Sequence, residues 1–183
     1  MSRLFFPALI IFLLLIVDGF LMNDLQLEEN IKFPDFQTVT FDGEEVTEKI
    51  FDGKITILCI WTARTEICFE VLSELENMQK NLPEDVQILG LYGERNISDA
   101  KKFSQKYSPS IPQLVANDDF FPVLTKIKTV PTTIFLDKQK NLIGQPAGGA
   151  DVKFIRRELN YILEKNSPRF LTAEKIQENI LYR

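Results

Sequence analysis

Thr65 and Cys68 have the spacing of a Cys-x-x-Cys redox motif, but a threonine stands in place of the first cysteine. Thr65 and Cys68 are separated by two residues, where an apolar run gives way to a helical pattern. In a Cys-x-x-Cys motif the first cysteine, at a helix N-terminus, is the low-pKa thiolate that attacks a disulfide, and the second resolves the mixed disulfide. A threonine hydroxyl needs a neighbouring base to act as a nucleophile. The chain has no histidine, so thiol chemistry at this motif depends on Cys68.

The segments around the motif predict a buried strand, a short loop and a helix. Residues 55–61 form an apolar run rich in isoleucine, which is typical of a buried strand. After the loop, apolar residues recur at spacings of three and four, as on one face of a helix. These residues are Cys68, Val71, Leu72, Leu75 and Met78. The motif is therefore expected to open a helix.

A second segment, much later in the chain, completes the pattern. Residues 129–133 read Thr-Val-Pro-Thr-Thr and precede a short apolar run at 134–136, which predicts a second buried strand. The peptide bond before Pro131 is predicted to be cis. Strand, helix and proline segment together are typical of a thioredoxin-like fold.

The ordered set of segments resembles the TlpA/ResA-like branch of the thioredoxin superfamily, which is related to the peroxiredoxin-like redoxins of the AhpC/TSA superfamily. The resemblance covers residues 31–165. It implies an α/β fold with a central mixed sheet flanked by helices, and thiol-disulfide oxidoreduction outside the cytoplasm. The segments that carry it are 33–36 with 40–43 for an opening β-hairpin, 60–68 for the motif loop, 130–137 for the cis-proline strand, and 141–144 with 148–150 for the last hairpin and turn.

Three departures from the family pattern concern the chemistry. Thr65 stands where the family has its attacking cysteine. Val71 stands where many members carry a carboxylate that assists proton transfer, and Ser73 replaces a common proline. The resemblance therefore implies the family's fold together with a reduced or lost dithiol activity.

Three functions remain open from the sequence. The first is a thiol-disulfide oxidoreductase of reduced activity that acts on protein thiols or disulfides. The second is a non-catalytic module that holds an extended peptide by backbone hydrogen bonds in a groove beside Pro131. The third is a single-cysteine, peroxiredoxin-like peroxidase that uses Cys68, because a Thr-x-x-Cys element also occurs in peroxiredoxins. The predicted site residues are Thr65, Cys68 and Pro131, with Trp61, Glu66, Ile67, Val130 and Thr132 as binding residues.

Two further residues bear on the thiol. Cys59 lies within the predicted buried strand, on the same side as every second residue of that strand, and is most simply a core residue. A Cys59–Cys68 bridge in an oxidising compartment is the alternative, and it requires the two α-carbons to lie within about 7 Å. Arg64 lowers the pKa of Cys68 only if its side chain folds back over the helix start.

Composition excludes several classes of function. The 183 residues, 45% of them hydrophobic, suit a single core. The net charge of −5 and the lack of a lysine and arginine cluster argue against nucleic-acid binding. Two cysteines and no histidine do not make a structural zinc site, and no cofactor is expected.

The N-terminus is expected to direct export. Residues 4–17 are continuously apolar after a short positive start, with the length of a signal-peptide core. We expect a signal peptide or membrane anchor over 1–22, a tether over 23–30 and a thioredoxin-like domain over 31–166. The apolar spacing of a C-terminal extension over 167–183 predicts a helix there. The protein would then be secreted, or held at the outer face of the cytoplasmic membrane by its N-terminal segment.

The rest of the domain is expected to add a strand at 86–92 and a helix at 97–107. Asp118 and Asp119 are predicted to cap another helix. Asp151 is predicted to open a last helix that runs to about residue 165.

Overall fold

The computed structural model describes residues 32–94, 96–107, 110–149 and 151–166. The predicted leader and tether and the predicted C-terminal extension lie outside these ranges. Within them, no helix is long and apolar enough to cross a membrane.

The domain is built on a five-stranded mixed sheet with the strand order β5-β4-β3-β6-β7. β4 is parallel to β3 and β5, whereas β6 is antiparallel to both β3 and β7. All seven residues of β3 are buried, because both faces of the sheet are covered. The strands are β3 (Ile55–Trp61), β4 (Val86–Tyr92), β5 (Gln113–Val115), β6 (Thr132–Leu136) and β7 (Leu142–Gly148).

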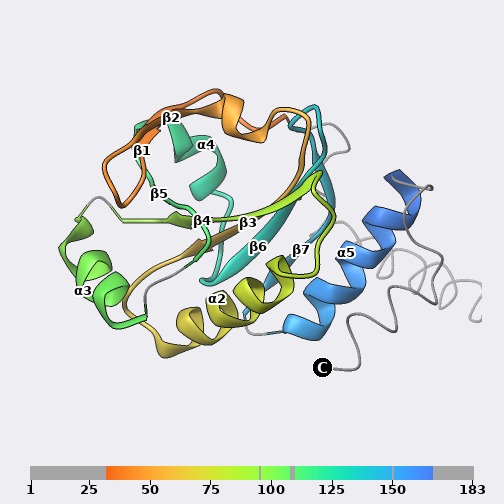
Figure 1. The fold of residues 1–183 in the computed structure, drawn as a ribbon. Coiled ribbons are helices and arrows are strands. Elements are labelled where there is room, and N and C mark those ends of the chain that lie inside the picture. The colour runs from red at the N-terminus through yellow and green to blue at the C-terminus, as the bar shows by residue number, and fades with distance from the viewer. Residues whose placement is uncertain (1–31, 95, 108–109, 150, 167–183) are drawn as a thin grey trace, which may run out of the picture. The chain divides into compact units, whose positions relative to one another are not determined.

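The two faces of the sheet carry different elements (Figure 1). One face is covered by α2 (Glu66–Gln79), α3 (Ile97–Tyr107) and α5 (Val152–Asn166). The other carries the hairpin of β1 (Gln37–Val39) and β2 (Glu45–Thr47), together with η1 (Glu48–Phe51), η2 (Asp118–Phe120) and α4 (Phe121–Leu124). This arrangement confirms the predicted thioredoxin-like fold.

Aromatic packing fixes the segments on the hairpin face. Phe33, Phe36, Phe51 and Phe120 are all buried, and their ring centroids lie 4.7 to 6.1 Å apart. Pairs of this kind stabilise a core beyond the burial of their area alone. The segment before β1 is thereby packed against the central sheet.

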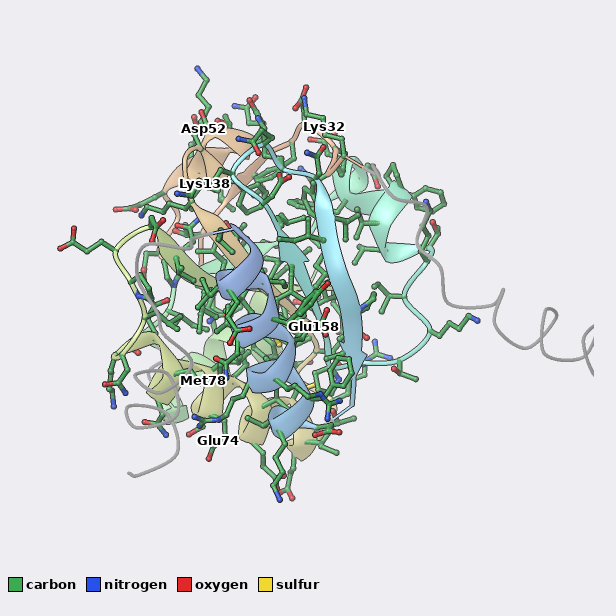
Figure 2. All side chains as sticks on the ribbon, turned by 90° about the vertical axis from the view of Figure 1, so that its right-hand side faces the viewer. Lys32, Asp52, Glu74, Met78, Lys138 and Glu158 are labelled. Atoms are coloured by element: carbon green, nitrogen blue, oxygen red, sulfur yellow. The ribbon has the colours of Figure 1, made fainter. Side chains whose placement is uncertain are left out.

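On the helix face, α2 and α5 are joined by packing and by an ion pair. Arg156 of α5 lies 3.3 Å from Glu74 of α2. Figure 2 shows Glu158 on α5 beside β7, and a side chain at Gly144 of β7 would come within 2.5 Å of the Glu158 carboxylate. Gly144 also has a φ of +66°, which favours glycine. The positive φ thus favours a glycine at the place where α5 packs on β7.

Most predicted elements are confirmed, and the differences are local. The hairpin is present, but its strands lie just after the two segments that suggested it. The cap before η2 is Asn117, whose side chain accepts a hydrogen bond from the Asp119 N–H at 3.1 Å, so the capping role predicted for Asp118 and Asp119 was wrong by one or two positions. The short edge strand β5 was not predicted.

Candidate functional site

The sheet register brings the motif loop and the proline segment to the same end of the sheet. Ile60, near the end of β3, pairs with Thr132 at the start of β6. The loop that leads to α2 leaves β3 after Trp61, and Pro131 directly precedes β6. The Val130–Pro131 peptide bond is cis, as predicted.

Thr65 and Cys68 contact each other at the start of α2. Thr65 is the N-cap residue, yet its hydroxyl does not cap the helix. It donates instead to Cys68 Sγ at 3.1 Å. The Thr65 side chain is exposed, whereas Cys68 is 0% exposed. The exposed position of the motif thus holds a hydroxyl, and the thiol lies behind it.

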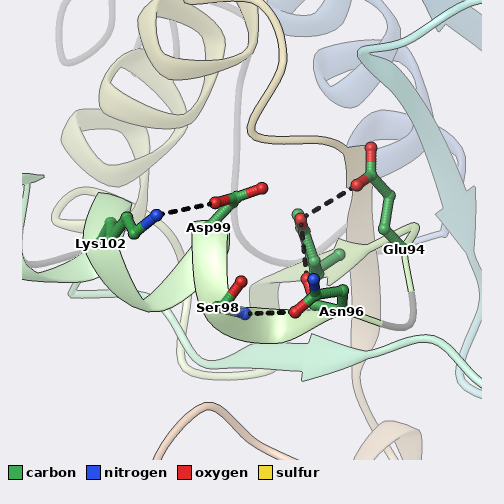
Figure 3. Close-up of polar contacts among 6 residues, drawn as sticks. Glu94, Asn96, Ser98, Asp99 and Lys102 are labelled. Atoms are coloured by element: carbon green, nitrogen blue, oxygen red, sulfur yellow. Dashed lines mark hydrogen bonds and ion pairs between the residues drawn. The ribbon is translucent and has the colours of Figure 1, made fainter.

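The nearest cation is engaged elsewhere. Arg64 Nε lies 2.8 Å from a carboxylate oxygen of Glu94, which follows β4. The Tyr92 hydroxyl lies 3.3 Å from both Glu94 Oε2 and the Asn96 carbonyl oxygen. Figure 3 shows Glu94 and Asn96 at this end of β4, with the Ser98 N–H donating to the Asn96 side chain. Arg64 therefore anchors the motif loop to the end of β4 and pairs with a carboxylate.

Trp61 belongs to the core. Its side chain is 0% exposed, and its ring centroid lies 5.1 Å from that of Tyr92 and 6.0 Å from that of Phe41. Its indole Nε1 donates to Gln113 Oε1 at 2.9 Å. The side chain has no surface with which to touch a substrate in this structure, although it was predicted as a binding residue.

Gln113 is the residue of this region that sequence reasoning missed. Its amide crosses directly over Gly90 of β4, where a Cβ atom would lie 1.9 Å from Gln113 Oε1. The amide nitrogen donates to the Ile111 carbonyl at 3.1 Å, so the buried amide is bonded at both ends. Gln113 lies in a three-residue strand after Pro112, which carries no periodic signal.

Of the other predicted binding residues, two are exposed, one is half-buried and one is buried. Glu66 is exposed and Ile67 is 38% exposed, both in the first turn of α2. Val130 is half-buried. Thr132 is 6% exposed, and its hydroxyl donates to the Thr129 carbonyl at 2.6 Å, so that it supports the proline loop from inside. The surface on which a partner could act consists of the α2 start and the Val130 segment.

Cys59 is a buried, protonated thiol behind the motif. Both cysteines are free, and both are 0% exposed in the same core cluster. Burial raises the pKa of Cys59 from 9.0 to about 12, the neighbouring Thr133 side chain opposes this shift, and the charge of a thiolate at Cys68 adds to it.

The stability of the domain is expected to fall as the pH rises from about 9 to about 12. Between these values an unfolded Cys59 loses its proton while the folded one keeps it, so the folded state binds more protons and the free energy of unfolding decreases with pH. Burial likewise raises the pKa of Tyr92 from 10.0 to about 12, and the neighbouring Glu94 is the next cause. Tyr92 therefore also lowers the free energy of unfolding as the pH rises. The loss from Cys59 is on the order of a few kcal/mol.

Urea unfolding followed at several pH values measures this dependence. Cys59→Ala should give a shallower decline than the parent over the same range, because the contribution of the Cys59 thiol is removed. Equal slopes in the two proteins would show that Cys59 is not the group responsible.

A hollow elsewhere on the domain contains none of the predicted site residues. It is open, has a volume of about 450 Å³ and lies on the hairpin side, between β1, β5 and η2. In the part of the chain that the structure describes, no group of three or more histidine, cysteine, aspartate or glutamate side chains is arranged to hold a metal ion.

Comparison with known proteins agrees with this geometry. Residues 30–145, more than half of the chain, match the AhpC/TSA family. The chain belongs to the AhpC/TSA family. Among curated proteins it is similar to "Thioredoxin-like protein YneN" of Bacillus subtilis (strain 168), with 22% identity over 124 residues, which is 64% of this chain and 70% of that protein.

Solved structures show the same fold. One is the thioredoxin domain of a thiol-disulfide oxidoreductase from Bacteroides vulgatus, with a TM-score of 0.59 and 21% identity over 73% of this chain and 99% of that one. Another is the pneumococcal exposed lipoprotein thioredoxin Etrx1 of Streptococcus pneumoniae, with a TM-score of 0.58 and 21% identity over 72% and 98%. StoA of Bacillus subtilis has a TM-score of 0.54 and 19% identity over 64% and 89%. This AhpC/TSA protein therefore shares its fold with thiol-disulfide oxidoreductases.

Proposed function

We propose that this AhpC/TSA protein works outside the cytoplasm, has lost two-thiol disulfide exchange, and retains the surface around the motif as a binding site for an extended polypeptide. The observation that carries the proposal is the Thr65–Cys68 contact. The exposed side chain at the position of the attacking cysteine is a hydroxyl, and it donates to a thiol that is 0% exposed. A protein disulfide that docks here meets no accessible sulfur.

The Thr65 hydroxyl is also poorly suited to replace the missing thiolate. A hydroxyl nucleophile needs a base that removes its proton. Its hydrogen-bond partner is the Cys68 sulfur, and the adjacent Arg64 is a cation paired with Glu94. The arrangement therefore supports binding better than covalent chemistry on a protein substrate.

The backbone beside Pro131 supports the binding part of the proposal. Among the described residues, neither the N–H nor the C=O of Val130 makes a hydrogen bond, whereas the Pro131 carbonyl accepts from the Gly149 N–H at 2.8 Å. An extended peptide can pair with such a free donor and acceptor as an added strand. Ile67, 38% exposed, supplies an apolar contact at the same end of the sheet.

The cellular location is proposed on two grounds. Residues 4–17 have the length and apolarity of a signal-peptide core. One structural relative is by its name an exposed lipoprotein. On this reading residues 1–22 direct export or anchor the chain to the membrane, 23–30 form a tether, and 31–166 form the working domain.

Binding without thiol chemistry is tested with a peptide whose cysteines are blocked. The carboxymethylated insulin B chain is titrated into the full chain, and the Kd is measured by calorimetry. Ile67→Asp is expected to raise the Kd at least about fivefold, which corresponds to about 1 kcal/mol. An aspartate in the first turn of a helix is favourable for the helix itself, so the fold is expected to survive the change.

Val39→Asp is the matched control, since Val39 is also 38% exposed but lies in β1. Its Kd should equal that of the parent. Absence of binding by the parent, or equal weakening by the two substitutions, would contradict a binding surface at the motif.

A further inference from the structure

Arg64 is an exposed cation whose side chain is held in place beside the motif. Its side chain is 78% exposed, and its Nε lies 2.8 Å from a carboxylate oxygen of Glu94. The Glu94 carboxylate also accepts a hydrogen bond from the hydroxyl of Tyr92, a residue of the core. Arg64 directly precedes Thr65, which stands where the family has its attacking cysteine. The guanidinium is therefore fixed next to the centre of the proposed binding surface.

The contact with Glu94 occupies only one edge of the guanidinium. An arginine carries five N–H donors in a planar fork, and the closest approach to Glu94 is made by Nε. Neither terminal amino group of Arg64 donates a hydrogen bond to any residue that the structure describes. The open edge can receive a carboxylate through two parallel hydrogen bonds, the geometry that makes arginine specific for this group.

The two segments that flank the proposed peptide position, residues 64–67 and 126–130, bear more cations than acids. The chain as a whole has a net charge of −5, so this excess is local. The charged side chains of the two segments are all exposed. They are Arg64, Glu66, Lys126 and Lys128. Complementary charges of this kind favour a partner with an acidic side chain at this place.

We propose that Arg64 determines the specificity of the binding surface, and that it selects extended polypeptides that place an aspartate or glutamate side chain beside Thr65. This inference rests on the proposed binding function and names the class of partner. Because Glu94 already holds the guanidinium, little side-chain freedom is lost when the carboxylate binds.

Two acidic residues on α2 limit this preference to one position of the partner. Glu66 and Glu70 are both exposed and lie four residues apart, on the same side of the helix. They repel a carboxylate that lies farther along α2. The favoured partner therefore carries its acidic residue beside Thr65 and not along the helix.

The test compares two forms of the insulin B chain that differ only in the group on the blocked cysteines. Carboxymethylation adds a carboxylate to each cysteine sulfur, and carbamidomethylation adds an uncharged amide of similar size. A blocked cysteine that lies beside Thr65, where the family would attack it, brings this group to Arg64. In calorimetric titrations of the full chain, we expect the carboxymethylated form to have a Kd about three- to tenfold lower, the factor of one charge-assisted pair at a partly exposed site.

Arg64→Gln removes the charge and should bring the two Kd values to within about twofold of each other. Lys102→Gln is the matched control, because Lys102 of α3 is 76% exposed and is also paired with a carboxylate, that of Asp99. It should keep the parent's preference for the carboxymethylated form. Both substitutions change exposed side chains, so both proteins are expected to fold.

Each remaining outcome would overturn the assignment of Arg64. Equal Kd values for the two forms in the parent would show that a carboxylate is not selected. A preference that persists in Arg64→Gln, even if both forms bind more weakly, would show that Arg64 only anchors the motif loop. In these two cases the peptide-binding proposal stands, whereas binding of neither form by the parent would overturn both.

Discussion

Replacing Trp61 with alanine is expected to lower the free energy of unfolding by about 3–5 kcal/mol. The indole is 0% exposed and packs against Tyr92, Phe41 and Phe69, so its removal leaves a cavity at the end of β3. It also leaves Gln113 Oε1 without its 2.9 Å donor, in a region that water does not reach. An unsatisfied buried acceptor adds to the cost of the cavity. Urea denaturation measures the change.

Ile67→Ala is the control for this substitution. Ile67 is 38% exposed in the first turn of α2, and its truncation should cost less than about 1 kcal/mol. The two residues were predicted together as binding residues, and the structure separates them into a core side chain and a surface side chain. A Trp61→Ala protein as stable as Ile67→Ala would contradict the placement of Trp61 in the core.

The central part of the fold was predictable because its elements have long, regular patterns. Residues 55–61 are apolar except for Thr56, and the spacing from Cys68 to Met78 marks a single buried helix face. The structure buries the five residues that this spacing selects. The cis bond before Pro131 was also predicted, from the order of the segments around it.

What the sequence did not reveal depends on contacts between distant residues. The Trp61–Gln113 hydrogen bond joins residues 52 positions apart, and it requires a glycine at position 90 that looks ordinary in the sequence. The pairing of Arg64 with Glu94 likewise depends on the loop after β4 returning to the start of α2. Side-chain directions of this kind follow from tertiary packing and not from local periodicity.

The exposure of the motif residues also needed the structure. Thr65 and Cys68 are both expected near a helix start, but only the geometry shows that the hydroxyl faces outward and the thiol inward. The burial of Cys68 bears on which reactions its thiol can undergo. A single exposed thiol would favour monothiol chemistry on proteins, whereas a buried thiol limits its reactions to small molecules.

Thr65→Cys is expected to restore reduction of protein disulfides, because the exposed nucleophile is the principal missing part. The motif loop, the α2 start and the cis Pro131 segment are all in place. A cysteine at a helix N-terminus has a lowered pKa and attacks disulfides, and Cys68 behind it is placed to resolve the mixed disulfide. Thr65→Ser is the matched control, since it changes the side chain without adding a thiol.

The rate of insulin reduction with dithiothreitol as donor, compared among the parent, Thr65→Cys and Thr65→Ser, tests the central claim most directly. We predict that the parent and Thr65→Ser remain at the rate of dithiothreitol alone. The Thr65→Cys protein should be at least about tenfold faster than the parent, because a thiolate replaces a hydroxyl that has no base. A parent that reduces insulin as fast as Thr65→Cys, or a Thr65→Cys protein no faster than Thr65→Ser, would contradict the claim that the loss of one exposed thiol explains the loss of dithiol exchange.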